Sequence, residues 1–574
     1  MPWRYDAPLR DMRFVIERVL EAPASWAQCA AFAELDSDTA AAVMEEGARF
    51  ASGVLLPLNA SGDREGCTLQ GGQVRMPAGF KAAYRALVEG GWPALAASAE
   101  WGGQGLPQLL DAAVREMMAA CNHGFMMVSD VLHGAYETLK SHGSAELQAR
   151  YLAKVASGEW PAAMALTEPQ AGSDLGALRT RAEPQPDGSL RISGSKIFIS
   201  GADHDLSDNI VHLALCRLPD APAGSKGLSL ALVPKMLPDG RRNAWVVDSL
   251  EHKLGLHASP TCALTYEGAT GWLVGEPHRG LAAMFLMMNS ARLHVGLQGL
   301  AHQEIATQNA LHHAFERVQF KAPIATMPAM RQHLLRLQAM VEGQRVIAYA
   351  AALAIDEAAH HADAAQRARQ QRRAALLTPL VKALLTQTGF DSASSALQVF
   401  GGYGYTQDYG IEQTLRDVRI ALVYEGTNEI QAIDLLQRKV LADGGAALAE
   451  LFVDLEAEAV RADGAGLGEF ATALREQMGR ARAVTAAIQA AAAGDAEAPL
   501  RVADAYLQGL SFLLLAWAWT ASARAAQGEP DTAFAAAKQA RMRHGIHWLL
   551  PEAAAHWVRA GATGLPLATV DTPH

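Results

Sequence analysis

The chain has 574 residues, of which half are hydrophobic and 19% are charged, and its formal net charge at pH 7 is -11. This composition excludes a disordered chain, and the length predicts several folded domains. The acidic balance disfavours passive adhesion to nucleic acid or to anionic lipid, although a local basic patch is compatible with it.

The first part of the chain has helical periodicity. From about residue 8 to 160, apolar residues recur at three- and four-residue steps, with breaks expected at Pro23, Gly62, 77–79 and 102–103. Short β-rich runs follow from about 161 to 275, separated by Gly, Pro and Asp turns; they include 190–192, 196–200, 210–215 and 228–233. We therefore expect a helical domain at 1–160 and a compact β domain at 161–275.

Helical periodicity returns in the second half of the chain. Long Ala- and Leu-rich segments such as 341–372 predict a helical bundle at 276–441. After the glycine-containing turn at 442–445, a separate C-terminal helical domain is expected at 442–574. Its most apolar stretch, 505–523, is interrupted by Gln508, Ser511 and Thr520, so it predicts a buried helix and not a membrane span.

Two features bear on the compartment. The five cysteines are scattered and odd in number, and none forms a Cys-x-x-Cys pair, so neither a disulfide framework nor a metal site is predicted. The first six residues carry charge where a signal peptide needs an apolar run. A reducing cytoplasm is the expected location.

Two distant segments carry a family resemblance. Ala165–Asp174 reads ALTEPQAGSD and Val423–Gln431 reads VYEGTNEIQ. They resemble the two signatures of the acyl-CoA dehydrogenase family, and four more segments match in family order: 194–201, 253–262, 316–320 and 398–405. The resemblance covers about residues 40 to 440. It implies a mostly α fold with an N-terminal helical domain, a central β-barrel and a C-terminal four-helix bundle.

The two ends of the chain resemble one particular branch of this family. Tyr5–Phe14 and the additional C-terminal helical domain are similar to the branch that contains 3-methylmercaptopropionyl-CoA dehydrogenases and some long-chain enzymes. The branch leaves the acyl chain length open, because one methylene changes binding by only about 1–3 kcal/mol.

The resemblance assigns the catalytic base to Glu425. Oxidation of an acyl thioester between Cα and Cβ needs a base for the α-proton and an acceptor for the β-hydride, which in this family is FAD. Glu425 follows an apolar run, and burial there would strengthen it as a base. The alternative is a helix-end charge paired with Arg416 or Arg419. Some branches take the base from the segment 289–292, where this chain has Ala291.

The resemblance also implies a FAD site. Leu166, Thr167, Gly172 and Ser173 are expected to line the flavin, where an ordinary Gly-Ser turn is the alternative. Phe198 and Ser200 are expected on one strand face, covering the ring and bonding near N5, in places where the family commonly has Trp and Thr. The remaining contacts carried over from the family are Arg317, Phe320, Gln398, Gly401, Gly402, Thr427 and Glu429. In the family, the matching arginine reaches FAD bound mainly to the neighbouring subunit.

Substrate contacts are expected from Ser173, Arg292 and Tyr424. Arg292 is a candidate for the CoA side, with a structural salt bridge as the alternative. The Met-rich stretch 284–288 suits either an adaptable acyl tunnel or core packing.

The partners follow from the same resemblance. An acyl-CoA substrate, an electron-transfer flavoprotein as electron acceptor and a homodimer are expected. A competing hypothesis is a flavoprotein of the same fold whose extra domain binds nucleic acid. It requires a basic C-terminal domain, whereas acidic residues outnumber basic ones after residue 441.

Overall fold

The computed structural model describes residues 3–568 and 570, which divide into two compact units. The first unit holds Ala42–His294, Gln407–Ile420 and the described part of Met1–Ala7. The second holds Pro8–Ala41, Val295–Thr406 and the described part of Ala421–His574.

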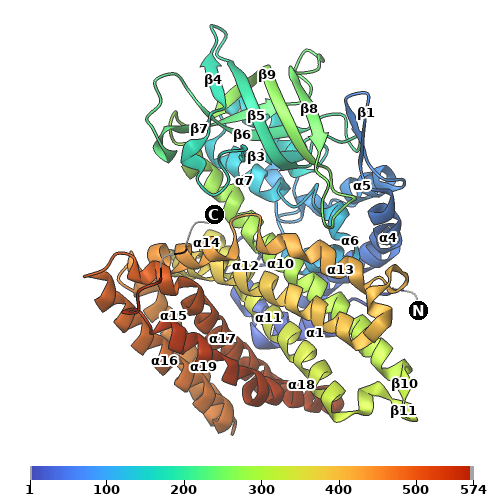
Figure 1. Cartoon of the computed structure of the whole chain (residues 1–574), viewed down its shortest axis with the longest axis vertical. Helices are drawn as coiled ribbons and strands as arrows, with labels where there is room; N and C mark the ends of the chain where they lie inside the picture. Colours follow the sequence, from blue (N-terminus) through green and yellow to red (C-terminus); the bar gives the residue numbers. More distant parts are fainter. Residues whose placement is uncertain (1–2, 569, 571–574) are drawn as a thin grey trace. The chain divides into compact units, whose positions relative to one another are not determined.

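The first unit contains a seven-stranded sheet (Figure 1). Its strands are β3 (Ala162–Ala165), β4 (Arg181–Pro184), β5 (Leu190–Ser200), β6 (Val211–Arg217), β7 (Leu228–Pro234), β8 (Trp245–Leu250) and β9 (Thr261–Val274). The order is β3-β6-β4-β5-β9-β7, with β8 on β9, and β7 pairs back onto β6. Five strands therefore close into a ring, which confirms the predicted β-barrel.

Strands β6 and β7 are buried along almost their whole length. Ala214 and Val233 face the barrel core, whereas Leu213 and Leu232 belong to a second core shared with α7 (Leu132–His142). Burial on both faces explains why these strands are nearly continuous apolar runs in the sequence.

Helices precede the barrel in the chain. They are α3 (Ser37–Phe50), α4 (Leu56–Glu65), α5 (Phe80–Glu89), α6 (Gln108–Met126), α7, α8 (Ala145–Leu147) and α9 (Ala153–Ala156), with a hairpin of β1 (Thr68–Gln70) and β2 (Gln73–Arg75). The break predicted at Gly62 is wrong, because Gly62 lies inside α4. A Cβ there would stand 2.7 Å from the Phe80 ring, so the glycine permits close packing.

Long helices dominate the second unit. They are α10 (Gly280–Glu316), whose first turns belong to the first unit, α11 (Pro328–His360) and α12 (Ala364–Phe400). Shorter elements complete this part of the chain: α1 (Leu9–Arg13), α2 (Ala22–Trp26), β10 (Val318–Gln319), β11 (Ala322–Pro323) and α14 (Asn428–Ile433). Helix α13 (Ile411–Val418) belongs to the first unit, and short 3₁₀ and π segments join the elements.

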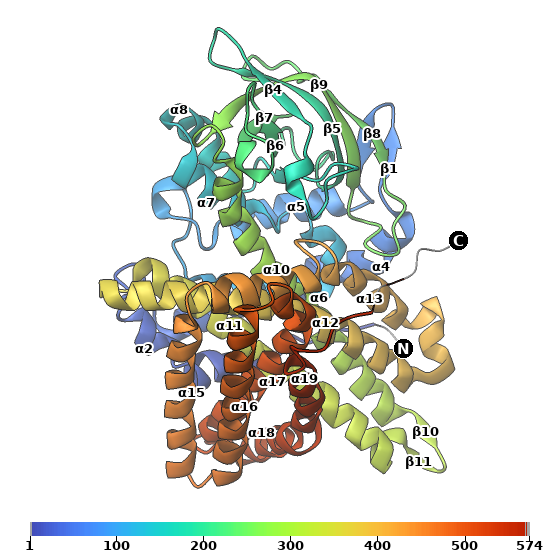
Figure 2. The same cartoon turned by 60° about the vertical axis from the view of Figure 1, so that its left-hand side comes forward.

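Among the C-terminal helices, α15, α16, α17 and α19 run side by side, and α18 packs on α17 (Figure 2). They are α15 (Ala446–Gly464), α16 (Gly468–Ala492), α17 (Ala498–Ala526), α18 (Thr532–His544) and α19 (Ala553–Ala560). Helix α17 is long and apolar enough to cross a membrane, but 83% of its most apolar window is buried inside the protein. The prediction of a buried helix is confirmed.

Trp519 fixes α17 against α11. Its ring is fully buried, and its Nε1 donates a 2.8 Å hydrogen bond to the Ala339 carbonyl. A Cβ at Gly343 or at Gly545 would stand within 2.7 Å of the ring, so the two glycines form the slot that the indole fills.

A buried network of charges joins the N-terminal segment to the C-terminal helices within the second unit. Lys538 on α18 pairs with Asp11 on α1 and lies 2.9 Å from Glu342 on α11. Arg345 pairs with Asp11 and with Glu304. Burial raises the pKa of Asp11, but the charges of Lys538 and Arg345 outweigh it and lower that pKa to about 2.

Candidate active site

The predicted flavin loop begins where β3 ends. Leu166 is buried, and the chain then reverses through two backbone hydrogen bonds between Glu168 and Ala171, of 2.9 and 3.1 Å. Beyond the turn, Gly172 and Ser173 are exposed. A Cβ at Gly172 would meet nothing within 4 Å, so the backbone there has open space for a ligand.

The end of β5 departs from regular alternation. Lys196 pairs with Leu264 and Ile199 with Cys262, so two residues on β5 oppose one on β9 in a β-bulge. Both Lys196 and Ile199 are buried, whereas Phe198 between them has a left-handed φ of 60° and is 59% exposed. Phe198 and Ser200 both lie outside the barrel core, but a strained bulge, and not simple alternation, turns Phe198 outward.

The predicted flavin loop and strand β5 are hydrogen-bonded to each other within the first unit. The Ile197 N–H donates to the Thr167 carbonyl over 3.0 Å, and Lys196 Nζ donates to the Leu166 carbonyl over 2.9 Å. Lys196 also pairs with Glu168 at 2.9 Å. Burial raises the pKa of Glu168, but the Lys196 charge and hydrogen bonds from Thr180 and Arg179 outweigh it and lower that pKa to about 2. Burial lowers the pKa of Lys196, and Glu168 offsets part of that effect.

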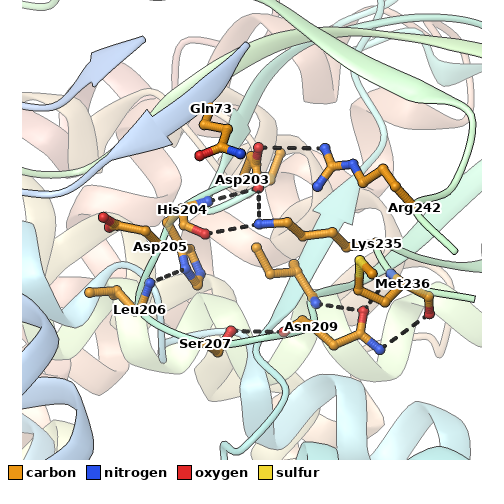
Figure 3. A network of polar contacts seen from close by, with 12 residues as sticks. Gln73, Asp203, His204, Asp205, Leu206, Ser207, Asn209, Lys235, Met236 and Arg242 are labelled. Atoms are coloured by element: carbon orange, nitrogen blue, oxygen red, sulfur yellow. Dashed lines mark hydrogen bonds and ion pairs between the residues drawn. The ribbon is translucent and has the colours of Figure 1, made fainter. Parts of the chain in front are cut away.

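Polar contacts also fix the loop that follows Ser200 (Figure 3). Asp203 is buried and pairs with Lys235 at 2.6 Å and with Arg242 at 3.6 Å. Lys235 donates a second bond to the His204 carbonyl, and Asn209 clamps the backbone of Met236. The loop is thereby held to the strands that follow it, which restricts the position of Ser200.

A polar cavity of about 200 Å³ lies beside the C-terminal end of β5. Thr261, the strand partner of Ser200, lines it together with Lys253, His257 and Ser259. The buried Ser259 hydroxyl has no hydrogen-bond partner among the described residues, and Lys253 donates to the Ser259 carbonyl over 2.9 Å. The cavity offers polar groups next to the predicted flavin contact Ser200.

Glu425 lies in a strained turn of the second unit. It is half-buried and left-handed with a φ of 57°, and Gly426 follows with a φ of 86°. The buried Gln431 side chain donates to the carbonyls of Glu425 (3.0 Å) and Gly426 (3.3 Å). Tyr424 donates its hydroxyl hydrogen to Gln298 Oε1. The turn that carries Glu425 is therefore held from both sides.

The residues after Glu425 begin α14. The Thr427 hydroxyl caps this helix by accepting from the Ile430 N–H, and Glu429 is exposed in its first turn. Arg416, an alternative partner for Glu425 in the sequence, bonds with Glu412 and Asp63.

Arg317 lies near the Gly-rich turn in the second unit. Its guanidinium carbon is 5.3 Å from the Tyr403 ring centroid, just after Gly401 and Gly402. A Cβ at either glycine would meet nothing within 4 Å, and Gln398 is exposed. Phe320 is 91% exposed. The structure thus brings the predicted arginine together with the predicted glycine turn.

Arg292 lies on α10 and is 6% exposed. Two residues on, His294 bonds to the Asp130 carbonyl, and Arg115 pairs with Asp111 and Asp130. Ala291 is buried and supplies no carboxylate. Met284 and Met287 are part of a hydrophobic core that includes barrel strands, which favours their packing role.

Three polar residues in these clusters were missed from the sequence: Lys196, Gln298 and Gln431. Lys196 continues the inward series of Leu190 and Ile192 on β5, and a charged residue at an inward position requires a buried partner. That signal could have led to Glu168. Gln431 lies within the predicted motif, but only the fold shows that it bonds the turn.

The exposed groups fit FAD. Open backbone at Gly172, Gly401 and Gly402 allows a ring or a pyrophosphate to come close, and an arginine suits a pyrophosphate. The exposed Phe198 ring offers a face for stacking.

Sequence models of one family match most of the chain. They are the acyl-CoA dehydrogenase N-terminal domain at residues 37–159, the middle domain at 163–269, the C-terminal domain at 278–440 and an acetyl-CoA dehydrogenase C-terminal-like domain at 446–571. The chain belongs to the acyl-CoA dehydrogenase family, whose members are enzymes that use FAD.

Similar curated proteins and solved structures agree with this family assignment. The chain is 41% identical to 3-methylmercaptopropionyl-CoA dehydrogenase of Ruegeria pomeroyi, over 98% of this chain and 99% of that protein. It is 36% identical to the broad-specificity linear acyl-CoA dehydrogenase FadE5 of Mycobacterium tuberculosis, over 80% of each. An acyl-CoA dehydrogenase of Bacillus anthracis, solved with FAD, shares the fold with a TM-score of 0.77 and 20% identity, over 93% of this chain and 90% of that one.

Proposed function

We propose that this enzyme converts an acyl-CoA thioester to the trans-2-enoyl-CoA, with Glu425 removing the α-proton. The observation that carries the proposal is the strained turn at Glu425, because left-handed backbone at a non-glycine residue is costly and clusters at functional sites. Gln431 and Tyr424 hold that turn, so the carboxylate is positioned in advance of the reaction.

FAD, when bound, accepts the β-hydride and so completes the oxidation. Leu166, Thr167, Gly172, Ser173, Phe198 and Ser200 are proposed to hold its ring system. The remaining part of FAD is proposed to contact a second set of residues, some of which reach FAD bound mainly to a second subunit: Thr427, Glu429, Arg317, Phe320, Gln398, Gly401 and Gly402.

The proposed domains are the four segments 1–160, 161–275, 276–441 and 442–574.

Ser173, Arg292 and Tyr424 are proposed to contact the substrate. Arg292 would place a buried guanidinium for the CoA portion. The relative of Ruegeria pomeroyi makes 3-methylmercaptopropionyl-CoA a first candidate, and straight-chain thioesters are the others. We place the reaction in cytoplasmic fatty acid metabolism, with an electron-transfer flavoprotein as electron acceptor.

A homodimer is the proposed assembly. Arg317, Phe320 and the glycine turn are exposed on the chain, as residues that reach FAD of a second subunit would be. Light scattering of the FAD-loaded protein should give twice the chain mass. A tetramer mass would contradict this proposal.

The nucleic-acid hypothesis has little support in the C-terminal helices. Arg475 pairs with Glu456 and Asp463, Arg524 with Glu458, and Arg543 with Glu469. Basic side chains engaged in this way offer less positive surface for phosphates.

An anaerobic absorbance titration tests the reaction. Acyl-CoA thioesters from butyryl to palmitoyl, together with 3-methylmercaptopropionyl-CoA, are added to FAD-loaded enzyme, and one chain class should bleach the flavin band. Glu425→Gln should bind the same thioester but lose bleaching by at least about 10²-fold in rate, since general base catalysis contributes about 10²–10⁴-fold. Wild-type bleaching by the variant would overturn Glu425 as the base.

A further inference from the structure

One buried side chain, Lys196, joins the flavin loop to the strand that carries Phe198. Its Nζ is fully buried and donates to the carbonyls of Leu166 (2.9 Å) and Leu215 (2.8 Å) and to Glu168 Oε1 (2.9 Å). An ammonium has three donors, so each of them is used.

Glu168, the ion-pair partner of Lys196, is hydrogen-bonded to the segment that follows the flavin loop. Its carboxylate accepts from the backbone N–H groups of Arg179 (2.7 Å) and Thr180 (3.0 Å) and from the Thr180 hydroxyl (2.6 Å). Gln170 donates a further bond from inside the loop. Both carboxylate oxygens are occupied, so the Lys196–Glu168 pair has no spare group for a proton transfer, and its contribution is geometric.

The bulge starts at the residue after Lys196. Because three acceptors hold Lys196 inward and Ile199 is also inward, residues 197 and 198 must fit between them opposite a single residue of β9. That arrangement turns Phe198 outward in its left-handed conformation. The same lysine therefore fixes the start of the flavin loop and the start of the bulge.

We propose that Lys196 and Glu168 are positioning residues for FAD, which set the loop 166–173 and the Phe198 ring in register with each other. The inference rests on the proposed function, in which this loop and Phe198 contact the flavin. It adds a buried ion pair, which itself touches neither cofactor nor substrate, to the determinants of cofactor binding.

The experiment compares two buried lysines. Lys196→Met removes the ion pair and the hydrogen bonds that join the flavin loop to β5. Lys538→Met removes a lysine of equal burial from the charge network of the second unit. FAD dissociation constants are measured by fluorescence on apoprotein reconstituted without acyl-CoA, with visible circular dichroism of the bound flavin and thermal unfolding of each variant. Both variants should lose thermal stability, because each leaves a buried carboxylate without its lysine.

Only Lys196→Met should weaken FAD binding, by about tenfold, the effect of displacing one hydrogen-bonded contact. Its flavin circular dichroism should also change. If Lys196→Met keeps the wild-type dissociation constant and spectrum while its stability falls like that of Lys538→Met, the pair is merely structural and the proposal is overturned.

A milder variant covers the case in which Lys196→Met does not fold. Thr180→Val keeps the ion pair and removes one bond to Glu168, so it should raise the FAD dissociation constant by a smaller factor and shift the spectrum. Wild-type values for Thr180→Val would then overturn the proposal. FAD binding is measured without turnover, so these outcomes are independent of whether Glu425→Gln abolishes dehydrogenation.

Discussion

Glu425 and its neighbours show how single side chains hold a costly conformation. Two carbonyls of the turn accept from Gln431, and the Tyr424 hydroxyl is held by Gln298. A base in such a turn depends on these contacts, because a displacement of about 1 Å can cost about 10²-fold in rate.

Gln431→Leu should therefore lower kcat by about 10- to 10²-fold, since the turn loses both side-chain bonds and the base is displaced. The FAD dissociation constant should stay at its wild-type value. Steady-state kinetics over a pH series checks this, because a displaced base changes the pH profile as well as the rate. Gln477→Leu removes another buried glutamine, bonded to Trp557, and should keep the wild-type profile. Equal losses in the two variants would contradict the positioning role.

The buried Glu168 carboxylate makes the stability of the fold depend on pH in the acid range. Its pKa in the folded protein is about 2, below the ordinary value of 4.5, so it stabilises the fold above pH 4.5 and loses that contribution as the pH falls toward 2. Glu168→Gln should be less stable than wild type at pH 7 by up to about 3 kcal/mol, with a difference that shrinks on acidification. Urea unfolding at pH 7, 4 and 3 measures this, because the contribution is lost only below pH 4.5. A difference that grows toward pH 3 would contradict it.

At the scale of elements, the barrel and helices followed from sequence patterns, but the bulge did not. The run Lys196-Ile197-Phe198-Ile199 is β-rich and reads as a regular strand, and only its pairing with β9 shows two residues opposite one. The motif likewise indicated Glu425 and the flavin loop by residue type. It could not indicate that Lys196 and Glu168 join the loop to the strand, because that role also depends on backbone carbonyls and N–H groups that only the fold brings near.

The bulge predicts a difference between two small substitutions at Phe198. Both Phe198→Gly and Phe198→Ala remove the exposed ring and should weaken FAD binding. Glycine adopts a φ of 60° without strain, whereas alanine does not, so the glycine variant should be more stable than the alanine variant by about 1 kcal/mol. Urea unfolding of the two apoproteins measures this difference. An alanine variant of equal or greater stability would show that the left-handed backbone carries no strain.

At the scale of the whole molecule, the C-terminal helices are part of the second unit's core. Trp519 fills a slot on α11 lined by Gly343, and α17 is buried along most of its length. This packing makes the extra domain a structural part of that unit.

Trp519→Ala should reduce the free energy of unfolding by about 3–5 kcal/mol, because it leaves a cavity and removes the indole hydrogen bond to the Ala339 carbonyl. Trp548, which is 60% exposed, supplies the control, since Trp548→Ala should change stability by less than about 0.5 kcal/mol. Urea unfolding monitored by circular dichroism compares them. Similar losses in both variants would contradict the packing role of Trp519.

The pairing of Asp11 with Lys538 has a consequence for synthesis of the chain. These two residues are 527 positions apart, so Asp11 leaves the ribosome long before the lysine with which it pairs. At about 5–20 residues per second, Asp11 waits roughly half a minute to two minutes for its lysine. Arg345 is synthesised before Lys538 and is the partner that can hold Asp11 in the meantime, so this network is completed only after Lys538 has emerged.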